Sequence, residues 1–195
     1  MSERRPGRPR SAAADGAILR ATLELLLEGG YRGLSMEHVA TRAGVGKATL
    51  YRRYGSREEL VADAVRHLNQ EIPPPDTGTV GGDIVALAGA VLAAAGRVGA
   101  ATFMPRMLAD AADDADMHAI FYENLVAPRR EVMAKVLRRG VARGELREDL
   151  DIELAVDLLA GPWVYRLLIS GGELPDIDPQ ALLDLVLSGI AAPSG

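Results

Sequence analysis

The 195-residue sequence contains no cysteine, and its longest uncharged apolar run, residues 84–96, is short. Without cysteine the chain has no disulfide, no thiolate metal ligand and no cysteine nucleophile, which suits a reducing cytoplasm. The run has 13 residues, whereas a membrane-spanning helix needs about 20. It predicts a buried helix rich in alanine and glycine, and no membrane partner is expected. Residues 1–11 lack the apolar segment of an export signal.

Residues that favour β-sheets are also scarce. Aromatic residues make up 4% of the chain, and there are only 8 isoleucines and 6 threonines. Alanine (31) and leucine (26) are abundant, and both favour helices. The composition therefore predicts an all-α protein.

The net charge of −5 is unevenly distributed. Residues 1–57 carry 11 Lys and Arg against 5 Asp and Glu, whereas residues 58–195 carry 11 against 22. A basic N-terminal part with an excess charge of +6 and an acidic remainder with −11 suggest that the N-terminal part meets a polyanion.

The basic part is expected to form four helices. Apolar residues recur at helical spacing, and residues that start or stop helices flank each segment. Ser35 is placed to cap the second helix, and Ser56 and Glu59 form a capping box for the fourth. The expected segments are residues 15–28, 35–44, 47–54 and 56–68.

A short turn, Gly44-Val45-Gly46, separates the second helix from the third. This is the spacing of a helix-turn-helix, in which one helix braces across the DNA backbone and the next lies in the major groove. Leu50 is expected to face the core. Lysine, arginine, threonine and tyrosine side chains can bind phosphates or base edges. The side chains left for DNA are those of Lys47, Ala48, Thr49, Tyr51, Arg52 and Arg53. The alternative is a solvated basic helix in an ordinary bundle.

The same segment resembles the DNA-binding domain of the TetR/AcrR family of tetracycline-repressor-like regulators. The similarity is carried by residues 33–54 with Ser56, Arg57, Glu58 and Leu60, within about residues 16–65. A weaker similarity to the family's C-terminal domains runs from about residue 122 to 171. The chain departs from the family pattern at Gly46, where serine is usual, and at Arg57, where lysine is usual. Glycine can still cap a helix, but it loses any side-chain contact with a phosphate.

The resemblance implies which side chains meet DNA. Lys47, Ala48 and Arg52 are expected to face bases, while Thr49, Tyr51, Arg53 and Arg57 mainly hold the backbone. The full set of expected DNA-binding residues is Arg8, Ser35, Arg42, Gly46, Lys47, Ala48, Thr49, Tyr51, Arg52, Arg53 and Arg57.

Residues 1–11 are expected to form a flexible basic arm, because Arg4–Arg10 is rich in proline. Its Gly7-Arg8-Pro9 core resembles an AT-hook, which can place Arg8 in a narrow A·T minor groove. The alternative is a disordered tail that adds only non-specific attraction.

The rest of the chain is expected to form a helical head and a helical body. The predicted domains are a DNA-binding head at residues 12–71, a linker rich in proline and glycine at 72–82, and a ligand-binding and dimerisation body at 83–195. Pro128 and Pro162 are expected to kink or divide two of the body helices. The expected body helices are residues 83–99, 103–112, 115–142, 151–170 and 178–191.

The last two body helices each carry two apolar faces. One face can pack on the core, and the other either packs on a partner chain or joins the same core. The resemblance implies a homodimer formed through these helices. The expected interface residues are Leu158, Tyr165, Leu182, Leu185 and Gly189.

The resemblance also implies a pocket for a small-molecule effector that the sequence does not name. Aromatic and methionine side chains suit such a pocket, although the same residues at helical spacing also suit an ordinary core. The candidates are Phe103, Met104, Met107, Phe121, Tyr122 and Trp163.

Neither metal binding nor catalysis has a clear sequence signature. His118 lies near several acidic residues, but acids at the start of a helix are ordinary caps and the spacing matches no metal motif. No catalytic residue, metal or cofactor is expected, and the chain is not expected to be an enzyme.

These patterns together predict a cytoplasmic, ligand-responsive transcriptional regulator, most simply a repressor. It is expected to bind a palindromic double-stranded DNA operator as a homodimer. The alternatives are a ligand-independent architectural DNA-binding protein, and a small-molecule carrier or enzyme that uses the helical body.

Overall fold

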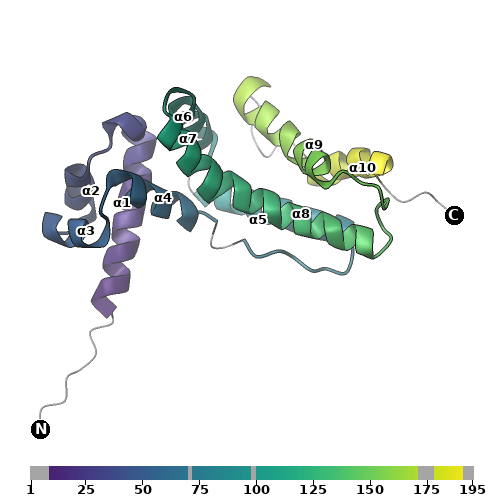
Figure 1. Cartoon of the computed structure of the whole chain (residues 1–195), viewed down its shortest axis with the longest axis horizontal. Helices are drawn as coiled ribbons and strands as arrows, with labels where there is room; N and C mark the ends of the chain where they lie inside the picture. The colour runs from purple at the N-terminus through teal and green to yellow at the C-terminus, as the bar shows by residue number, and fades with distance from the viewer. Residues whose placement is uncertain (1–8, 70–71, 98–99, 171–177, 191–195) are drawn as a thin grey trace, which may run out of the picture. The chain divides into compact units, whose positions relative to one another are not determined.

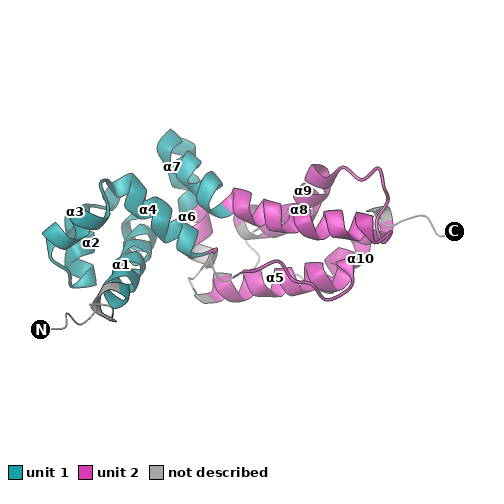
Figure 2. Cartoon of the chain, turned by 60° about the horizontal axis from the view of Figure 1, so that its bottom comes forward, with its two compact units in different colours: residues 1–68, 106–125 teal, residues 69–105, 126–195 magenta. Residues whose placement is uncertain are grey.

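The structure, a computed structural model of the chain, describes residues 9–69, 72–97, 100–170 and 178–190. Every regular element in these ranges is a helix, which confirms the all-α prediction (Figure 1). No helix within them is long and apolar enough to span a bilayer. The chain divides into two compact units, shown in Figure 2: unit 1 comprises residues 1–68 and 106–125, and unit 2 comprises residues 69–105 and 126–195.

Unit 1 contains the predicted DNA-binding head. Helix α1 packs against α2 and α4, and α4 packs against α7. Ile18, Val39, Leu50 and Leu60 are fully buried. The elements are α1 (Pro9–Gly33), α2 (Met36–Ala43), α3 (Lys47–Arg53), α4 (Arg57–His67), the second part of α6 (Ala100–Asp113), α7 (Ala115–Phe121) and most of the π-helical turn η1 (Tyr122–Val126).

The two ends of α1 differ in how well the sequence predicts them. The helix begins at Pro9 rather than near Asp15, because proline fits the first turn of a helix, where its missing N–H has no intrahelical partner. At the other end Gly30 adopts φ +68°, which interrupts the helix as the Gly29–Gly30 pair predicts. One more helical turn then continues to Gly33.

The helix-turn-helix forms as its local signals predict. The Ser35 side chain accepts a hydrogen bond from the backbone N–H of His38 at 3.2 Å, which caps α2. Gly44 adopts the left-handed conformation with φ 67°, and its N–H reaches the carbonyls of Ala40 and Thr41. The chain therefore turns at once into α3.

Unit 2 is a bundle built on α5 and α8, which pack together. Helix α9 packs against α8, and α10 packs against both α5 and α9. The core includes Ile84, Leu137, Val156 and Leu183. The elements are α5 (Val80–Arg97), the first part of α6, α8 (Ala127–Ala142), α9 (Ile152–Tyr165), the π-helical turn η2 (Arg166–Ser170) and α10 (Pro179–Ile190).

The uncharged run at residues 84–96 lies in α5, but the helix is not buried all round as expected. Ile84, Leu87 and Ala94 are buried, whereas Ala86 and Ala93 are exposed. Alanine exposes little apolar area, so one side of such a helix can face water at small cost.

Proline divides the long helix that was expected at residues 115–142. Pro128 lies in the first turn of α8, directly after the π-helical turn η1. Pro162 lies inside α9, and the π-helical turn η2 follows it. Helices in series are one of the two outcomes expected from these prolines.

A buried carboxylate fastens the segment before α5. Asp83 is fully buried and accepts hydrogen bonds from the Thr77 N–H at 2.6 Å and from Arg139 Nη2 at 2.9 Å. Burial alone would raise the pKa of Asp83, but the bonds from Thr77 and Arg143 and the charge of Arg139 hold it below its ordinary value. The part of the expected linker from Thr77 onward is thus tied to α8.

Candidate nucleic-acid interface

Helix α3 presents a polar, basic face anchored by one leucine. Leu50 is fully buried against the head, as the sequence predicts. Lys47, Ala48, Tyr51 and Arg52 are exposed, and Thr49 and Arg53 are half-buried. Arg52 forms no ion pair or hydrogen bond within the described part of the chain. The helix therefore offers side chains of the types that bind phosphates and base edges.

Gly46 precedes α3 as its N-terminal cap and contributes only backbone hydrogen bonds. Its carbonyl accepts hydrogen bonds from Thr49 N at 2.9 Å and Leu50 N at 3.2 Å, and it has no side chain to cap the helix. Its φ of −68° is open to any residue, and an added Cβ would lie 3.9 Å from Thr49 Oγ1. Glycine is therefore not required here by the backbone.

Glu37 on α2 lies beside the basic face of α3. The Tyr51 hydroxyl donates a hydrogen bond to Glu37 Oε1 at 3.1 Å, and Lys47 Nζ lies 3.7 Å from the same oxygen. The backbone amide of Glu37, and then the Tyr51 hydroxyl, hold the pKa of the Glu37 carboxyl below its ordinary value. The acid is ionised near neutral pH and fixes the direction of two predicted DNA-binding side chains.

Arg42, one of the predicted DNA-binding residues, is paired with α1. Its two terminal nitrogens bind the two Glu28 oxygens at 2.9 and 2.8 Å, and Nη1 lies 3.4 Å from Glu24. The bond from Arg42 lowers the pKa of Glu28. The pairing ties α2 to α1 through a planar fork of two parallel bonds.

Arg53 and Arg57 also connect to α1. Arg53 Nη1 lies 2.9 Å from Asp15, and its side chain is only 22% exposed. The Arg57 guanidinium lies 4.1 Å from the centre of the Tyr31 ring and bonds Glu58 at 3.3 Å. A phosphate that approached either arginine would compete with these contacts. Their roles in DNA binding remain predictions.

Of the two remaining predicted DNA-binding residues, Ser35 is described by the structure and Arg8 is not. The Ser35 oxygen accepts the capping bond of α2, and its own hydrogen is still able to donate to a phosphate. Arg8 and Gly7 of the AT-hook-like core lie outside the described residues.

Sequence reasoning missed the residues of the head that contact the predicted DNA-binding arginines. Glu28 and Asp15 pair with arginines 14 or more positions away, and Tyr31 packs against Arg57. No local spacing rule connects residues so far apart. The available signal was the spacing of Glu24 and Glu28, which lie one helical turn apart on α1 and so share a face of that helix.

The predicted effector residues are divided between the two units. Phe103, Met104 and Trp163 belong to unit 2, and the first of these is buried while the others are half-buried. Met107 and Phe121 are buried in unit 1, where Tyr122 is exposed and stacks on the ring of His118. Neither unit brings all six together. A surface groove of about 410 Å³ in unit 2 has another lining: Pro74, Lys135, Arg138, Arg139 and Ala142.

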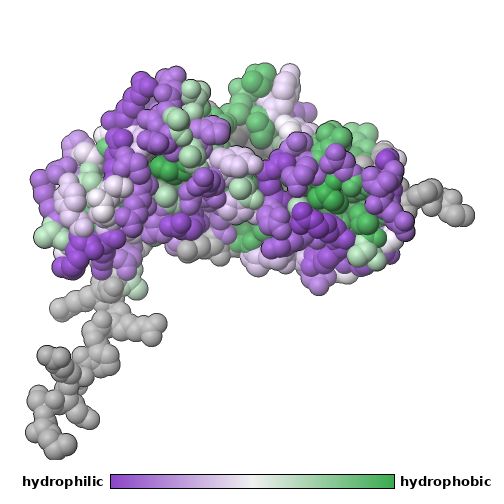
Figure 3. Space-filling view, in the orientation of Figure 1, coloured by the Kyte–Doolittle hydropathy of each residue, from purple (hydrophilic) through white to green (hydrophobic). Residues whose placement is uncertain are grey.

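The predicted dimer residues lie where α9, η2 and α10 expose apolar side chains (Figure 3). Leu158, Tyr165 and Leu185 are 50%, 59% and 76% exposed, and Leu182 is half-buried. Gly189 lies in α10. The opposite faces, with Leu159 and Leu183, are buried in unit 2.

The acids near His118 act as helix caps and surface ion pairs. Asp114 accepts hydrogen bonds from the N–H groups of Asp116 and Met117 at the start of α7, and Asp113 pairs with Arg32. Within the residues described, no three His, Asp or Glu side chains are grouped in a way that could hold a metal ion.

A four-helix head whose third helix projects a basic face after a tight turn defines a DNA-binding protein of the helix-turn-helix class. Comparison with known families identifies the family within this class. Residues 18–64 match the family "Bacterial regulatory proteins, tetR family", and residues 74–186 match "Tetracyclin repressor-like, C-terminal domain". The chain belongs to the TetR family, and it is a DNA-binding transcriptional regulator.

Relatives and solved structures agree with this assignment. The uncharacterised HTH-type transcriptional regulator YdeS of Bacillus subtilis is 34% identical, with 96% of this chain and 95% of that protein covered. The DNA-binding transcriptional repressor TetR of Mycobacteroides abscessus is 30% identical, with 94% and 97% covered. The crystal structure of the TetR family regulator SCO0332 is similar with a TM-score of 0.69 and 32% identity, over 90% of this chain and 97% of that one.

Proposed function

We propose that the protein is a ligand-responsive transcriptional repressor that binds a palindromic operator as a homodimer. The observation that carries this proposal is the surface of α3, where Lys47, Tyr51 and Arg52 are exposed around a buried Leu50. Two such helices in successive major grooves would lie about 34 Å apart. A regulator of this kind acts on the chromosome, and thus in the cytoplasm.

The exposed apolar residues of α9, η2 and α10 support the homodimer. Leu158, Tyr165, Ile169 and Leu185 are all at least half exposed in the single chain. Covering such side chains in a symmetric interface releases apolar area from water, and a C2 dimer matches the symmetry of a palindrome.

Helix α6 supports a response to ligand, because the chain passes from one unit to the other within it. Its first residues belong to unit 2, and the part from Arg106 onward packs in unit 1. There the Tyr31 N–H donates a hydrogen bond to Asp110 at 2.7 Å, directly after the Gly30 break in α1. An effector that prefers one position of α6 would change the population of DNA-binding conformations by its difference in affinity.

Two similar proteins also support a ligand-responsive repressor. The 30% identical protein of Mycobacteroides abscessus is named a repressor. A more distant structure, FadR of Bacillus subtilis at 18% identity and TM-score 0.67, was solved in complex with stearoyl-CoA. It shares the fold, and it shows that this fold can hold an organic ligand.

The test of the proposal is footprinting of the full chain on the DNA upstream of its own gene. We expect protection of a palindromic site, with Arg52→Ala relaxing base preference at one position of each half-site by about 1–3 kcal/mol. Arg147→Ala, which removes an exposed body arginine paired with Asp149, is the matched control and should change nothing. Protection without sequence preference would instead indicate an architectural DNA-binding protein.

The homodimer needs a separate test by sedimentation of the DNA-free protein. Leu185→Glu places a charge on the proposed interface and should shift the protein toward the monomer and weaken operator binding. Ala119→Glu adds the same charge at an exposed position of α7 and should leave the dimer intact. A dimer unchanged by Leu185→Glu would argue against this interface.

A further inference from the structure

Arg129 on α8 differs from the other half-buried arginines of the described chain. Its guanidinium Nε donates a hydrogen bond to the Asn69 side-chain oxygen at 2.8 Å, and it has no acidic partner within the described residues. The remaining half-buried arginines are each paired with an Asp or Glu: Arg53, Arg57, Arg130 and Arg139. A guanidinium removed from water without an opposite charge is costly for the fold.

Arg129 shares a face of α8 with two apolar residues. Val132 and Met133 lie one helical turn further along the same face of α8, and both pack against the cluster of Ile72, Leu87 and Ala94. Burial lowers the pKa of Arg129, although arginine remains charged at any physiological pH. A cation without an acidic partner among the described residues therefore lies on the same face of α8 as two partly buried apolar side chains.

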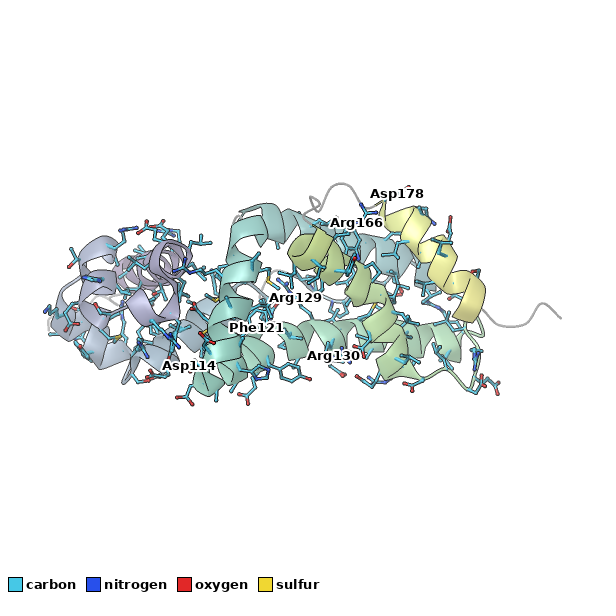
Figure 4. All side chains as sticks on the ribbon, turned by 90° about the horizontal axis from the view of Figure 1, so that it is seen from above. Asp114, Phe121, Arg129, Arg130, Arg166 and Asp178 are labelled. Carbon is cyan, nitrogen blue, oxygen red and sulfur yellow. The ribbon has the colours of Figure 1, made fainter. Side chains whose placement is uncertain are left out.

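Arg130, the next residue along α8, differs from Arg129 because it has acidic partners. Arg130, which Figure 4 labels together with Arg129, pairs with Glu153 at 3.0 Å and with Asp157, both on α9, so its charge is matched by acids. The charge of Arg129 stays unmatched by any acid in the described part of unit 2. One planar guanidinium can bind one carboxylate through two parallel hydrogen bonds, and its single positive charge matches the single negative charge of the carboxylate.

We propose that Arg129 is the anion-recognition residue of the effector site, and that the effector is a small organic carboxylate with an apolar body. This inference rests on the proposed ligand-responsive function. The carboxylate binds the guanidinium that Asn69 orients, and the apolar part of the ligand packs beside Val132 and Met133.

The experiment uses the full chain, isothermal titration and four probes. Decanoate and 2-naphthoate carry an aliphatic and an aromatic body, and decanol and 2-naphthalenemethanol are their neutral counterparts. We expect at least one carboxylate to bind tenfold or more tightly than its neutral counterpart, because a hydrogen bond to a charged group discriminates by about this much. Arg129→Met should abolish the preference, Arg129→Lys should retain part of it, and Arg130→Met should keep it.

A second measurement separates ligand recognition from a structural role. Without ligand, Arg129→Met should raise the melting temperature by about 1–3 °C, because an apolar side chain of similar length replaces a half-buried charge that has no acidic partner among the described residues. A lower melting temperature would show that the arginine supports the fold, and it would overturn the proposal. Equal binding of each carboxylate and its neutral counterpart to the wild type would do the same.

Different results would contradict the carboxylate-binding role of Arg129 and the proposed ligand-responsive function. If a neutral or cationic compound releases the protein from its operator, and Arg129→Met responds to it like the wild type, the repressor function stands and the carboxylate inference is wrong. If Arg129-dependent carboxylate binding is found but operator binding is unaffected by it, the site stands and the ligand-responsive function is wrong.

Discussion

The Tyr51 hydroxyl donates a hydrogen bond to Glu37 Oε1 at 3.1 Å, which joins the exposed face of α3 to the first turn of α2. The same carboxylate oxygen lies 3.7 Å from Lys47 Nζ. An acid at a DNA-binding surface repels phosphates, yet Glu37 also holds two predicted DNA-contacting side chains in one geometry. We therefore expect Glu37 to lower the affinity for DNA of any sequence and to raise the selectivity for the operator.

Glu37→Gln is expected to make DNA binding tighter and less selective. The substitution removes the repulsive charge and releases Lys47 to neutralise a phosphate. Affinity for non-specific DNA should rise by about two- to fivefold at low salt, and the slope of log K against log salt should become steeper by about 0.9. Affinity for the operator should rise less, so the ratio of specific to non-specific binding falls. Fluorescence anisotropy at several salt concentrations measures all three quantities.

Asp149→Asn provides the control for Glu37→Gln, because it removes an exposed carboxylate of the body that is paired with Arg147. It should leave the salt slope unchanged. If Glu37→Gln also left both the slope and the specificity ratio unchanged, Glu37 would have no part in the interface.

Gly46→Ser is expected to stabilise the head slightly and to strengthen operator binding. The backbone at Gly46 is already extended, and an added side chain meets only Thr49 Oγ1 at 3.9 Å. A serine hydroxyl can accept from the first free N–H groups of α3, which is worth a few tenths of a kcal/mol relative to glycine, and can also donate to a phosphate. Thermal unfolding and anisotropy test the two effects. Gly46→Ala, which has the Cβ without the hydroxyl, should show neither gain.

Gly30→Ala is expected to destabilise unit 1 and weaken the contact between α1 and α6. Gly30 has φ +68°, and an added Cβ would lie 2.8 Å from Arg106 Nε and 2.9 Å from Asp110 Oδ2. With φ +68° and ψ −177°, Gly30 has a backbone conformation that essentially only glycine adopts, which costs alanine about 1–3 kcal/mol, and displacing the Arg106 and Asp110 side chains adds to this cost. The free energy of unfolding in urea should fall by about 2–4 kcal/mol.

Gly33 supplies the matched control for Gly30. It lies in the last turn of the same helix, and an added Cβ there meets nothing within 4 Å. Gly33→Ala should therefore leave stability within about 0.5 kcal/mol of the wild type. Equal effects of the two substitutions would mean that the close approach of Arg106 and Asp110 does not matter.

The elements that the sequence predicts well are those decided by a few neighbouring residues. Ser35 bonds the N–H three positions on, and the Ser56 side chain bonds Glu59 in the same way. Gly44 ends α2 because few other residues tolerate its φ of 67°. Such interactions depend on local backbone geometry, so spacing alone predicts them.

The partners of the head arginines could not be predicted in the same way. Arg42 meets Glu28 across two helices, and Arg57 meets Tyr31 from 26 positions away. These pairs exist only once α1, α2 and α4 have packed together. Sequence patterns therefore predict which residue types lie at the basic surface. Whether each arginine meets a phosphate or a neighbouring acid depends on tertiary structure, which these patterns do not contain.

The ionisation of Tyr31 makes the stability of unit 1 depend on pH under alkaline conditions. Its hydroxyl donates a hydrogen bond to Glu58 at 2.9 Å. Burial, followed by this bond, raises the pKa of Tyr31 to about 12 from an ordinary value of 10. The unfolded chain therefore releases this proton first. The stabilisation from protonated Tyr31 is complete below pH 10 and is lost as the pH rises toward about 12.

Tyr31→Phe removes this titration while keeping the ring on which Arg57 rests at 4.1 Å. Below pH 10 the wild type should be the more stable protein, because the phenylalanine variant leaves Glu58 without the hydrogen bond from the hydroxyl. The difference should narrow by up to about 1 kcal/mol between pH 10 and about 12, a figure reduced for the solvent that partly screens the hydroxyl. Urea unfolding of both proteins from about pH 8 to 12 measures the difference, and other tyrosines cancel because both proteins share them. A difference that stays constant over this range would show that Tyr31 titrates alike in the folded and unfolded chain.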